Sequence, residues 1–357
     1  MTALTALSAV DARSAARATT NRVKLALFAV AATVAVLLPM FADNFIIRLA
    51  TLALVSALFA MSVDLMAGYA GLVTLGHAGV LATAMYGVGY VASKTEGGVP
   101  TQILVGFSAG MIASVIFGLM AMRSTGVYFI MITIAQGMII WGLASLLVNI
   151  TGAENGLLGI RRPVSIEGDF QYYYVVLAAV ALCSALLFII VRSPFGYALK
   201  GLRGSETRVR MLGHNSAFLK FYMFVISGFF ATVAGILLVY LNEFVNPSDA
   251  ILGASALPVL MTILGGIGTL VGPFIGAFVI VFLRNWVSIH IDRWPTLLGI
   301  IFILVVLFAR EGLVGAISKW WHRRLATSSP DQPAPLHAEE HAGILASDDS
   351  IEAAVSQ

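Results

Sequence analysis

Hydrophobic residues form long runs that recur from Leu25 to Phe308 and are separated by short polar stretches. A helix needs roughly 20 largely apolar residues to cross a bilayer, and most of the runs are of about that length. Runs such as LFAVAATVAVLLPMF and GIIFILVVLF are continuous rather than alternating, which is typical of membrane helices and not of membrane barrels. The pattern predicts an all-α polytopic membrane protein of about ten transmembrane helices. The expected spans are 25–42, 46–66, 79–93, 101–122, 125–149, 171–191, 221–241, 251–264, 268–289 and 296–309.

The composition supports a membrane protein. Of the 357 residues, 59% are hydrophobic and only 11% are charged, and the mean hydropathy is +0.93. A soluble domain cannot bury that much apolar surface. The first apolar run, after Lys24, lacks a convincing cleavage site and is interpreted as a retained helix rather than a signal peptide. The single cysteine, Cys183, lies inside an apolar run, so an intramolecular disulfide is excluded.

The distribution of positive charge predicts the orientation. If the N-terminus is cytoplasmic, most of the 21 Lys and Arg residues fall on the cytoplasmic side, and the positive-inside rule then favours cytoplasmic N- and C-termini. We expect a cytoplasmic tail over 1–24, a transmembrane domain over 25–310 and a largely disordered cytoplasmic tail over 311–357, whose end is rich in Pro, Ala, Ser and Asp. The predicted location is the cytoplasmic (inner) membrane.

Glycine-rich segments interrupt the apolar pattern once in each half of the chain, in GYAGLVTLGHAG and in GGIGTLVGPFIGA. Broken backbone at membrane depth needs partners for its polar groups, so such segments line a watery cavity or are buried in protein. Close helix packing through small residues explains the glycines equally well. The candidate translocation-pathway residues are Gly68, Gly71, Thr74, Gly76, His77, Gly265, Gly266, Gly268 and Gly272.

Two ionisable residues, Asp64 and His77, flank the first interruption. We interpret His77 as a hydrogen-bonded structural residue rather than part of a proton relay, because nothing nearby completes a relay. Asp64 is expected at the inner end of its helix. The sequence has no metal-ligand spacing, P-loop, nucleophile elbow or paired-carboxylate site, so we expect no metal, no cofactor and no enzymatic activity.

The longest internal hydrophilic connection, 192–220, carries six positive charges and one negative charge. Its middle, SETRVRMLG, predicts a short helix with Ser205 as N-cap and Gly213 as C-terminal stop. Gly201 and Gly204 suggest a flexible beginning of this connection. It could contact a cytosolic partner or rest on anionic lipid headgroups.

Five stretches, in this order along the chain, resemble the permease subunits of ATP-binding-cassette (ABC) importers for branched-chain amino acids, the hydrophobic amino-acid uptake family, and most closely its LivM type. They are GYAGLVTLGHAG, TGAENGLLGI, RSPFGYALKGLRGSETRVRMLGHN, KFYMFVISGFFATVAGIL and GGIGTLVGPFIGA. The resemblance implies an ABC importer permease fold and import of branched-chain or other hydrophobic amino acids. Urea and short amides are the alternative substrates, since relatives in the superfamily carry them, and an ion-coupled secondary transporter is the alternative class.

The resemblance also implies partners. These are two cytosolic ATPase subunits, a second permease subunit that is a copy or a related chain, and an extracytoplasmic solute-binding protein, with membrane lipid around them and no nucleic acid. Residues Glu206, Arg208, Leu212 and Gly213 match the helix that couples such permeases to the ATPase. TGAENGLLGI, ahead of Arg161 and Arg162, is a candidate contact for the binding protein, and a structured loop without such a contact is the alternative.

Overall fold

The chain folds almost entirely into helices. A computed structural model describes residues 33–95, 97–163 and 166–290, together with the single residues 296, 299, 300, 303 and 312. Within this part of the chain, six helices are long and apolar enough to cross a membrane: Asn44–Tyr69, Val99–Ala121, Gly126–Leu146, Asp169–Arg192, Ser216–Asn242 and Val271–Ser288. The predicted all-α polytopic membrane fold is confirmed.

The helix bounds follow the expected spans closely. The helices are α2 (Asn44–Asp64), continued by η1 (Leu65–Tyr69), α3 (His77–Lys94), α4 (Val99–Ala121), α5 (Gly126–Leu146), α6 (Val148–Thr151), α7 (Asp169–Arg192), α8 (Pro194–Gly204), α9 (Glu206–Met211), α10 (Ser216–Asn242), α11 (Leu252–Gly265) and α12 (Val271–His290). Eight expected spans coincide with such helices. The expected span 25–42 is described only from residue 33, and the span 296–309 and both tails lie almost wholly outside the described residues.

Two of these eight helices are less typical of membrane spans. α11 has 14 residues, which at about 1.5 Å per residue reaches only about two-thirds of the way across a hydrocarbon core of about 30 Å. α3 has 18 residues, including glycine, serine and threonine, and it is buried along most of its length. Most of α3 and half of the residues of α11 are buried within the bundle.

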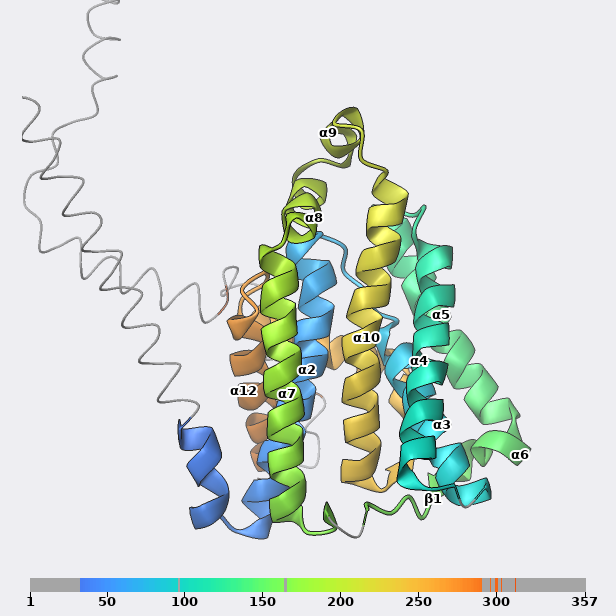
Figure 1. The fold of residues 1–357 in the computed structure, drawn as a ribbon, viewed down its shortest axis with the longest axis vertical. Helices are drawn as coiled ribbons and strands as arrows, with labels where there is room; N and C mark the ends of the chain where they lie inside the picture. Colours follow the sequence, from blue (N-terminus) through green and yellow to red (C-terminus); the bar gives the residue numbers. More distant parts are fainter. Residues whose placement is uncertain are drawn as a thin grey trace, which may run out of the picture. The chain divides into compact units, whose positions relative to one another are not determined.

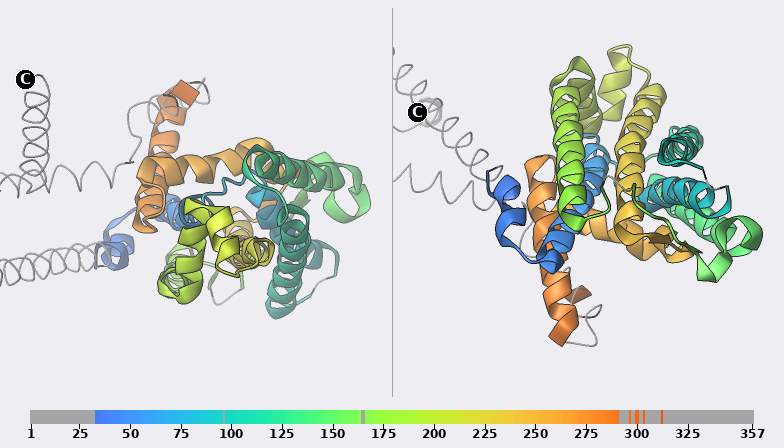
Figure 2. Two further views of the ribbon diagram at one scale, coloured as in Figure 1. Left: turned by 90° about the horizontal axis from the view of Figure 1, so that it is seen from above. Right: turned by 60° about the horizontal axis from the view of Figure 1, so that its bottom comes forward.

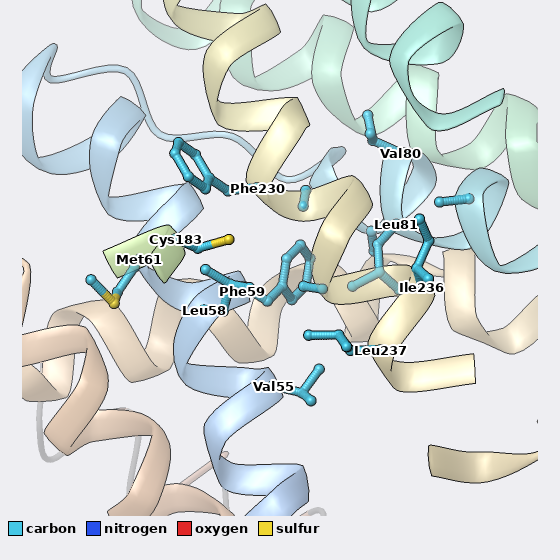
Figure 3. Packing of buried hydrophobic residues seen from close by; sticks show 14 of the residues in the cluster. Val55, Leu58, Phe59, Met61, Val80, Leu81, Cys183, Phe230, Ile236 and Leu237 are labelled. Carbon is cyan, nitrogen blue, oxygen red and sulfur yellow. The ribbon is translucent and has the colours of Figure 1, made fainter. Parts of the chain in front are cut away.

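α2 and α10 form the centre of the bundle (Figure 1). α7, α11 and α12 pack on α2, while α3 and α4 pack on α10, which also contacts α2. Their buried apolar side chains form two clusters. In the larger one, Val55, Leu58 and Phe59 of α2 face Phe230 and Leu237 of α10 (Figure 3), and in the smaller one α2 packs on α11 and α12. Since lipid tails are as apolar as leucine, tight packing rather than exclusion from water stabilises such contacts.

Small residues allow the backbones of this core to approach closely. A side chain at Gly235 of α10 would lie 3.2 Å from the carbonyl carbon of Leu81 in α3, and one at Gly228 would lie 2.6 Å from the Ser114 Cβ atom in α4. Both contacts are tighter than ordinary van der Waals contact, which begins at 3.4 Å. The glycines of α10 thus fix its distance from α3 and α4.

At one end of the bundle, two distant loops pair. β1 (Leu157–Leu158) and β2 (Phe244–Val245) are antiparallel, with Leu157 opposite Val245. The 3₁₀ turns η2 (Ala153–Asn155) and η4 (Pro247–Ala250) flank them. The motif TGAENGLLGI thus forms an ordered cap over the end of α10.

A charge cluster of Arg48, Arg162 and Asp169 lies at the same end. The buried Arg162 side chain donates hydrogen bonds to the Tyr240 carbonyl (2.8 Å) and to the Asp169 Oδ1 atom (2.8 Å), and Arg48 donates to the Leu241 carbonyl (3.2 Å). Arg48 also lies 3.9 Å from Asp169. The carbonyls at the end of a helix have no partner within it, so these arginines satisfy the end of α10.

At the opposite end, α8 and α9 connect the neighbouring helices α7 and α10 (Figures 1 and 2). The expected short helix is confirmed as α9, and the Ser205 hydroxyl accepts a hydrogen bond from the Arg208 amide, as an N-cap does. Gly201 and Gly204 both lie in α8, and the flexible beginning expected for this connection stays a prediction. Leu199 and Leu202 are buried there, and their packing holds α8 helical despite its glycines.

Candidate functional site

The first glycine interruption begins where α2 changes to a π-helical turn. Residues Leu65–Tyr69 form this turn, the chain then runs without helix from Ala70 to Gly76, and α3 begins at His77. Gly71 has φ +72°, a conformation that favours glycine. Single π-helical turns frequently occur at functional sites. Figure 1 shows this segment as a blue coil running from the upper end of α2 toward α3.

The second interruption lies between α11 and α12. Three residues there have positive φ: Gly266 (121°), Gly268 (82°) and Leu270 (55°). The Thr269 hydroxyl donates to the Gly266 carbonyl (2.8 Å) and accepts from the Gly272 amide (2.9 Å). This side chain therefore satisfies backbone groups that the broken helix leaves without partners.

The two interruptions touch each other, although they are about 200 residues apart in the sequence. The fully buried Asp64 carboxylate accepts hydrogen bonds from the Gly268 amide (2.7 Å) and the Leu270 amide (3.3 Å). A side chain at Gly68 would lie 2.6 Å from the Gly268 Cα atom. Asp64 lies near the end of α2, as expected, but its contact with the second interruption was not predicted. An acidic residue in an apolar run was the available signal.

His77 lies deeper in the bundle and is hydrogen-bonded through both ring nitrogens. Its Nε2 atom lies 2.7 Å from the Ser227 hydroxyl, which donates to the Ser62 carbonyl, and its Nδ1 atom lies 3.3 Å from the Thr74 hydroxyl. Because the Ser227 proton is directed to Ser62, Nε2 donates and Nδ1 accepts. His77 is fully buried, and these hydrogen bonds support its structural interpretation, which stays a prediction.

Close packing accounts for several of the candidate pathway glycines. A side chain at Gly76 would lie 2.9 Å from the carbonyl carbon of Thr133, and one at Gly265 would lie 2.9 Å from the Gly272 Cα atom. Gly266 is buried and Gly71 is exposed. These contacts support the packing interpretation in this conformation, and a water-lined pathway along the same residues stays a prediction.

The candidate coupling residues do not share one environment. Glu206 faces inward, where it accepts a hydrogen bond from Lys220 Nζ (2.9 Å) and pairs with Arg210. Partial burial alone would raise the pKa of Glu206, but the hydrogen bonds from Lys220, Ser216 and Arg210 outweigh it and lower that pKa. Glu206 thus fastens α9 to α10.

The other coupling residues face outward. Arg208 is exposed, and Leu212 is 78% exposed next to Met211, which is 80% exposed. Gly213 has φ +83° and no neighbouring atom within 4 Å of an added side chain, so it ends α9 as expected. The exposed apolar side chains of Met211 and Leu212, at the C-terminal end of this short basic helix, form a small projecting surface. We call this surface the α9 tip.

The described residues contain no group of three or more His, Cys, Asp or Glu side chains arranged to hold a metal ion. The polar groups of the two interruptions are instead engaged in hydrogen bonds within the bundle.

Comparison with known proteins places the chain in a family. Residues 45–309 match the family described as "Branched-chain amino acid transport system / permease component". The high-affinity branched-chain amino acid transport system permease protein LivM of Escherichia coli is 26% identical over 82% of this chain and 76% of its own length, and that of Salmonella typhimurium is 25% identical over the same shares. The ribose import permease protein RbsC of Haemophilus influenzae is 30% identical over 28% of this chain and 32% of its own length. No solved structure is significantly similar. The chain belongs to the family of branched-chain amino-acid transport system permease components.

Proposed function

We propose that this chain is the membrane-spanning subunit of an ATP-binding-cassette importer that carries branched-chain or other hydrophobic amino acids across the cytoplasmic membrane. Membership of the permease family and the names of the LivM relatives support this proposal. The chain itself performs no catalysis, and ATP hydrolysis takes place in two cytosolic ATPase subunits.

The α9 tip is the observation that carries the proposal. Met211 and Leu212 are almost fully exposed at the end of a connection that leaves the helix bundle. Leucine and methionine on a short helix are suited to a hydrophobic groove of a soluble partner, and the exposed Arg208 beside them is suited to an acidic rim. The ion pair of the partly buried Glu206 with Lys220 of α10 gives that surface a fixed position.

The remaining partners are assigned to the other faces. The binding protein docks at the β1–β2 end, where Glu154, Asn155 and Arg161 are exposed. Arg162 is buried and takes no part in that contact. A second permease subunit, a copy or a relative, completes the pathway, and lipid covers the remaining apolar surface. Both termini are cytoplasmic.

Two alternative functions differ from this proposal, one in its substrate and the other in its energy source. Urea or a short amide would be imported by the same machinery, whereas a secondary transporter would use a proton or sodium gradient. Asp64 and His77 are the intramembrane groups that we considered for ion coupling, and both are engaged in structural hydrogen bonds. That engagement favours an ATP-driven importer.

The test is reconstitution. The chain is co-expressed with the ATPase, permease and binding-protein genes that neighbour its own, and the purified complex is placed in liposomes. We expect uptake of labelled leucine, isoleucine or valine that requires ATP and the binding protein. Uptake of urea or acetamide alone would reassign the substrate. Uptake that follows an ion gradient without ATP would overturn the proposal.

Substitutions in and next to α9 test whether the α9 tip is the contact with the ATPase. Leu212→Glu places a charge on the α9 tip without touching the bundle, so we expect loss of ATPase co-purification and of uptake at normal membrane levels. Leu212→Met keeps the apolar contact and serves as the matched control. Glu206→Lys and Gly213→Asp are expected to abolish uptake as well. Wild-type uptake in Leu212→Glu and in both of these variants would exclude α9 as the coupling helix.

A further inference from the structure

α8 reaches the unwound end of α2 through two basic side chains. Arg203 Nη1 donates a hydrogen bond of 2.6 Å to the carbonyl of Gly68, which lies in the π-helical turn η1. The Lys200 ammonium lies 5.6 Å from the centre of the Tyr69 ring, within reach of a cation–π contact. The last carbonyls of a helix lack partners within it, so Arg203 supplies one from outside.

The Arg203 side chain also lies against both glycine interruptions. A Cβ atom at Gly71 would be 3.0 Å from Arg203 Cγ, and one at Gly268 would be 3.3 Å from Arg203 Nη1. The Gly268 amide is in turn held by the Asp64 carboxylate at 2.7 Å. One side chain from the 192–220 connection therefore contacts the first interruption directly and lies over its junction with the second.

α8 is joined closely to the α9 tip. Ser205 is the only residue between the two helices, and an added side chain at Gly201 of α8 would be 3.3 Å from Val209 Cγ2 of α9. Val209 is itself buried. Because the two helices pack on each other, a displacement of the tip is passed to α8 and to Arg203.

We propose that Arg203 is a positioning residue that transmits movement of the α9 tip to the junction of the two helix interruptions. This inference rests on the proposed function, since it requires an ATPase that moves the tip. The Arg203 hydrogen bond holds the end of α2 in the present state, and displacement of α8 releases the Gly68 carbonyl and loosens the junction held by Asp64.

The test follows the junction itself with a single reporter cysteine. Cys183 is replaced by alanine, and Ile267, an exposed residue of the second interruption, is replaced by cysteine. In the reconstituted complex, the rate of reaction with a water-soluble thiosulfonate is measured without nucleotide and with a non-hydrolysable ATP analogue. With Arg203 present, we expect the two rates to differ by about tenfold, because one charge-assisted hydrogen bond made in only one state shifts an equilibrium by about that factor.

Arg203→Ala should abolish this difference and lower the amount of substrate carried per ATP hydrolysed, while the ATPase subunits remain bound. Arg203→Lys keeps a donor and a charge and should restore part of both. Arg123→Ala removes a positive charge from the α4–α5 turn at the same end and should leave both readouts unchanged. A purely structural role would lower the protein level without changing the ratio of transport to hydrolysis.

If Arg203→Ala does not accumulate, Arg203→Met takes its place, because it keeps a long aliphatic side chain but has no donor for the Gly68 carbonyl. An unchanged labelling response and transport ratio in the accumulating variant overturns the inference. A different result would contradict the proposed function itself: the complex with Arg203 intact would then lack bound ATPase subunits or ATP-dependent uptake.

Discussion

Replacement of Gly68 by alanine tests the contact between the two interruptions. The new Cβ atom would overlap the Asp64 Oδ1 atom and lie 2.5 Å from the Gly268 nitrogen, whereas ordinary contact begins at 3.4 Å. Both partners of the 2.7 Å hydrogen bond between the Gly268 amide and the Asp64 carboxylate must therefore move, the amide by about 0.9 Å. Displacements of that size take the bond out of the normal range of hydrogen bonds.

The expected destabilisation follows from these two changes. Overpacking of a closely packed site costs about 1–3 kcal/mol, and the weakened hydrogen bond adds about 1 kcal/mol, so we expect a total of about 2–4 kcal/mol. Gly142→Ala is the matched control, because Gly142 lies inside α5 with no atom within 4 Å of the added methyl group. Alanine is a better helix former than glycine by up to about 1 kcal/mol, so this variant should be at least as stable as the wild type.

Thermal denaturation in detergent, followed by the loss of the monodisperse peak in size-exclusion chromatography, measures the effect. We expect Gly68→Ala to lose its fold about 5 °C or more below the wild type and Gly142→Ala to match it. Equal midpoints for the two variants would refute the reasoning that Gly68 and Gly268 are in enforced contact.

Three further predictions concern polar groups. Asp64→Ala leaves the Gly268 and Leu270 amides without an acceptor and should lower stability by about 2–4 kcal/mol, whereas Asp64→Asn keeps one acceptor and should lose less in the same detergent assay. Arg162→Lys cannot reach the several acceptors of the guanidinium and should cost about 3 kcal/mol; a wild-type midpoint would contradict its role at the end of α10. Because the pKa of Glu206 is lowered, its contribution to stability is complete above the pKa of unfolded glutamate, about 4.3, and is lost only as the pH falls through the lower folded value. Amide exchange in α9 should therefore be independent of pH near neutrality, after correction for intrinsic rates, and rise in acid, and Glu206→Gln should remove the acid dependence.

Features that depend on local sequence could be predicted. The long apolar runs gave the positions of α4, α5, α7 and α10 to within a few residues, because length and hydropathy determine whether a segment can cross lipid. The start of α9 at Ser205 and its end at Gly213 followed from capping chemistry, which involves only neighbouring residues.

Features that depend on contacts between residues far apart in the sequence could not be predicted. α8 contains three glycines, which argue against a helix, and the burial of Leu199 and Leu202 helps to stabilise it. The bond between Asp64 and Gly268 joins residues that are 204 positions apart, so neither local pattern reveals it. The glycine interruptions were recognised from the sequence, but their mutual contact is a property of the tertiary fold.

The charge cluster of Arg48, Arg162 and Asp169 has a mechanical consequence. It ties the ends of α2, α7 and α10 to one another at the end of the bundle opposite α9. If a partner displaces α9, as proposed, these three helices stay joined at the cluster, so the largest movement would fall at their opposite ends, near the contact of Gly68 with Gly268.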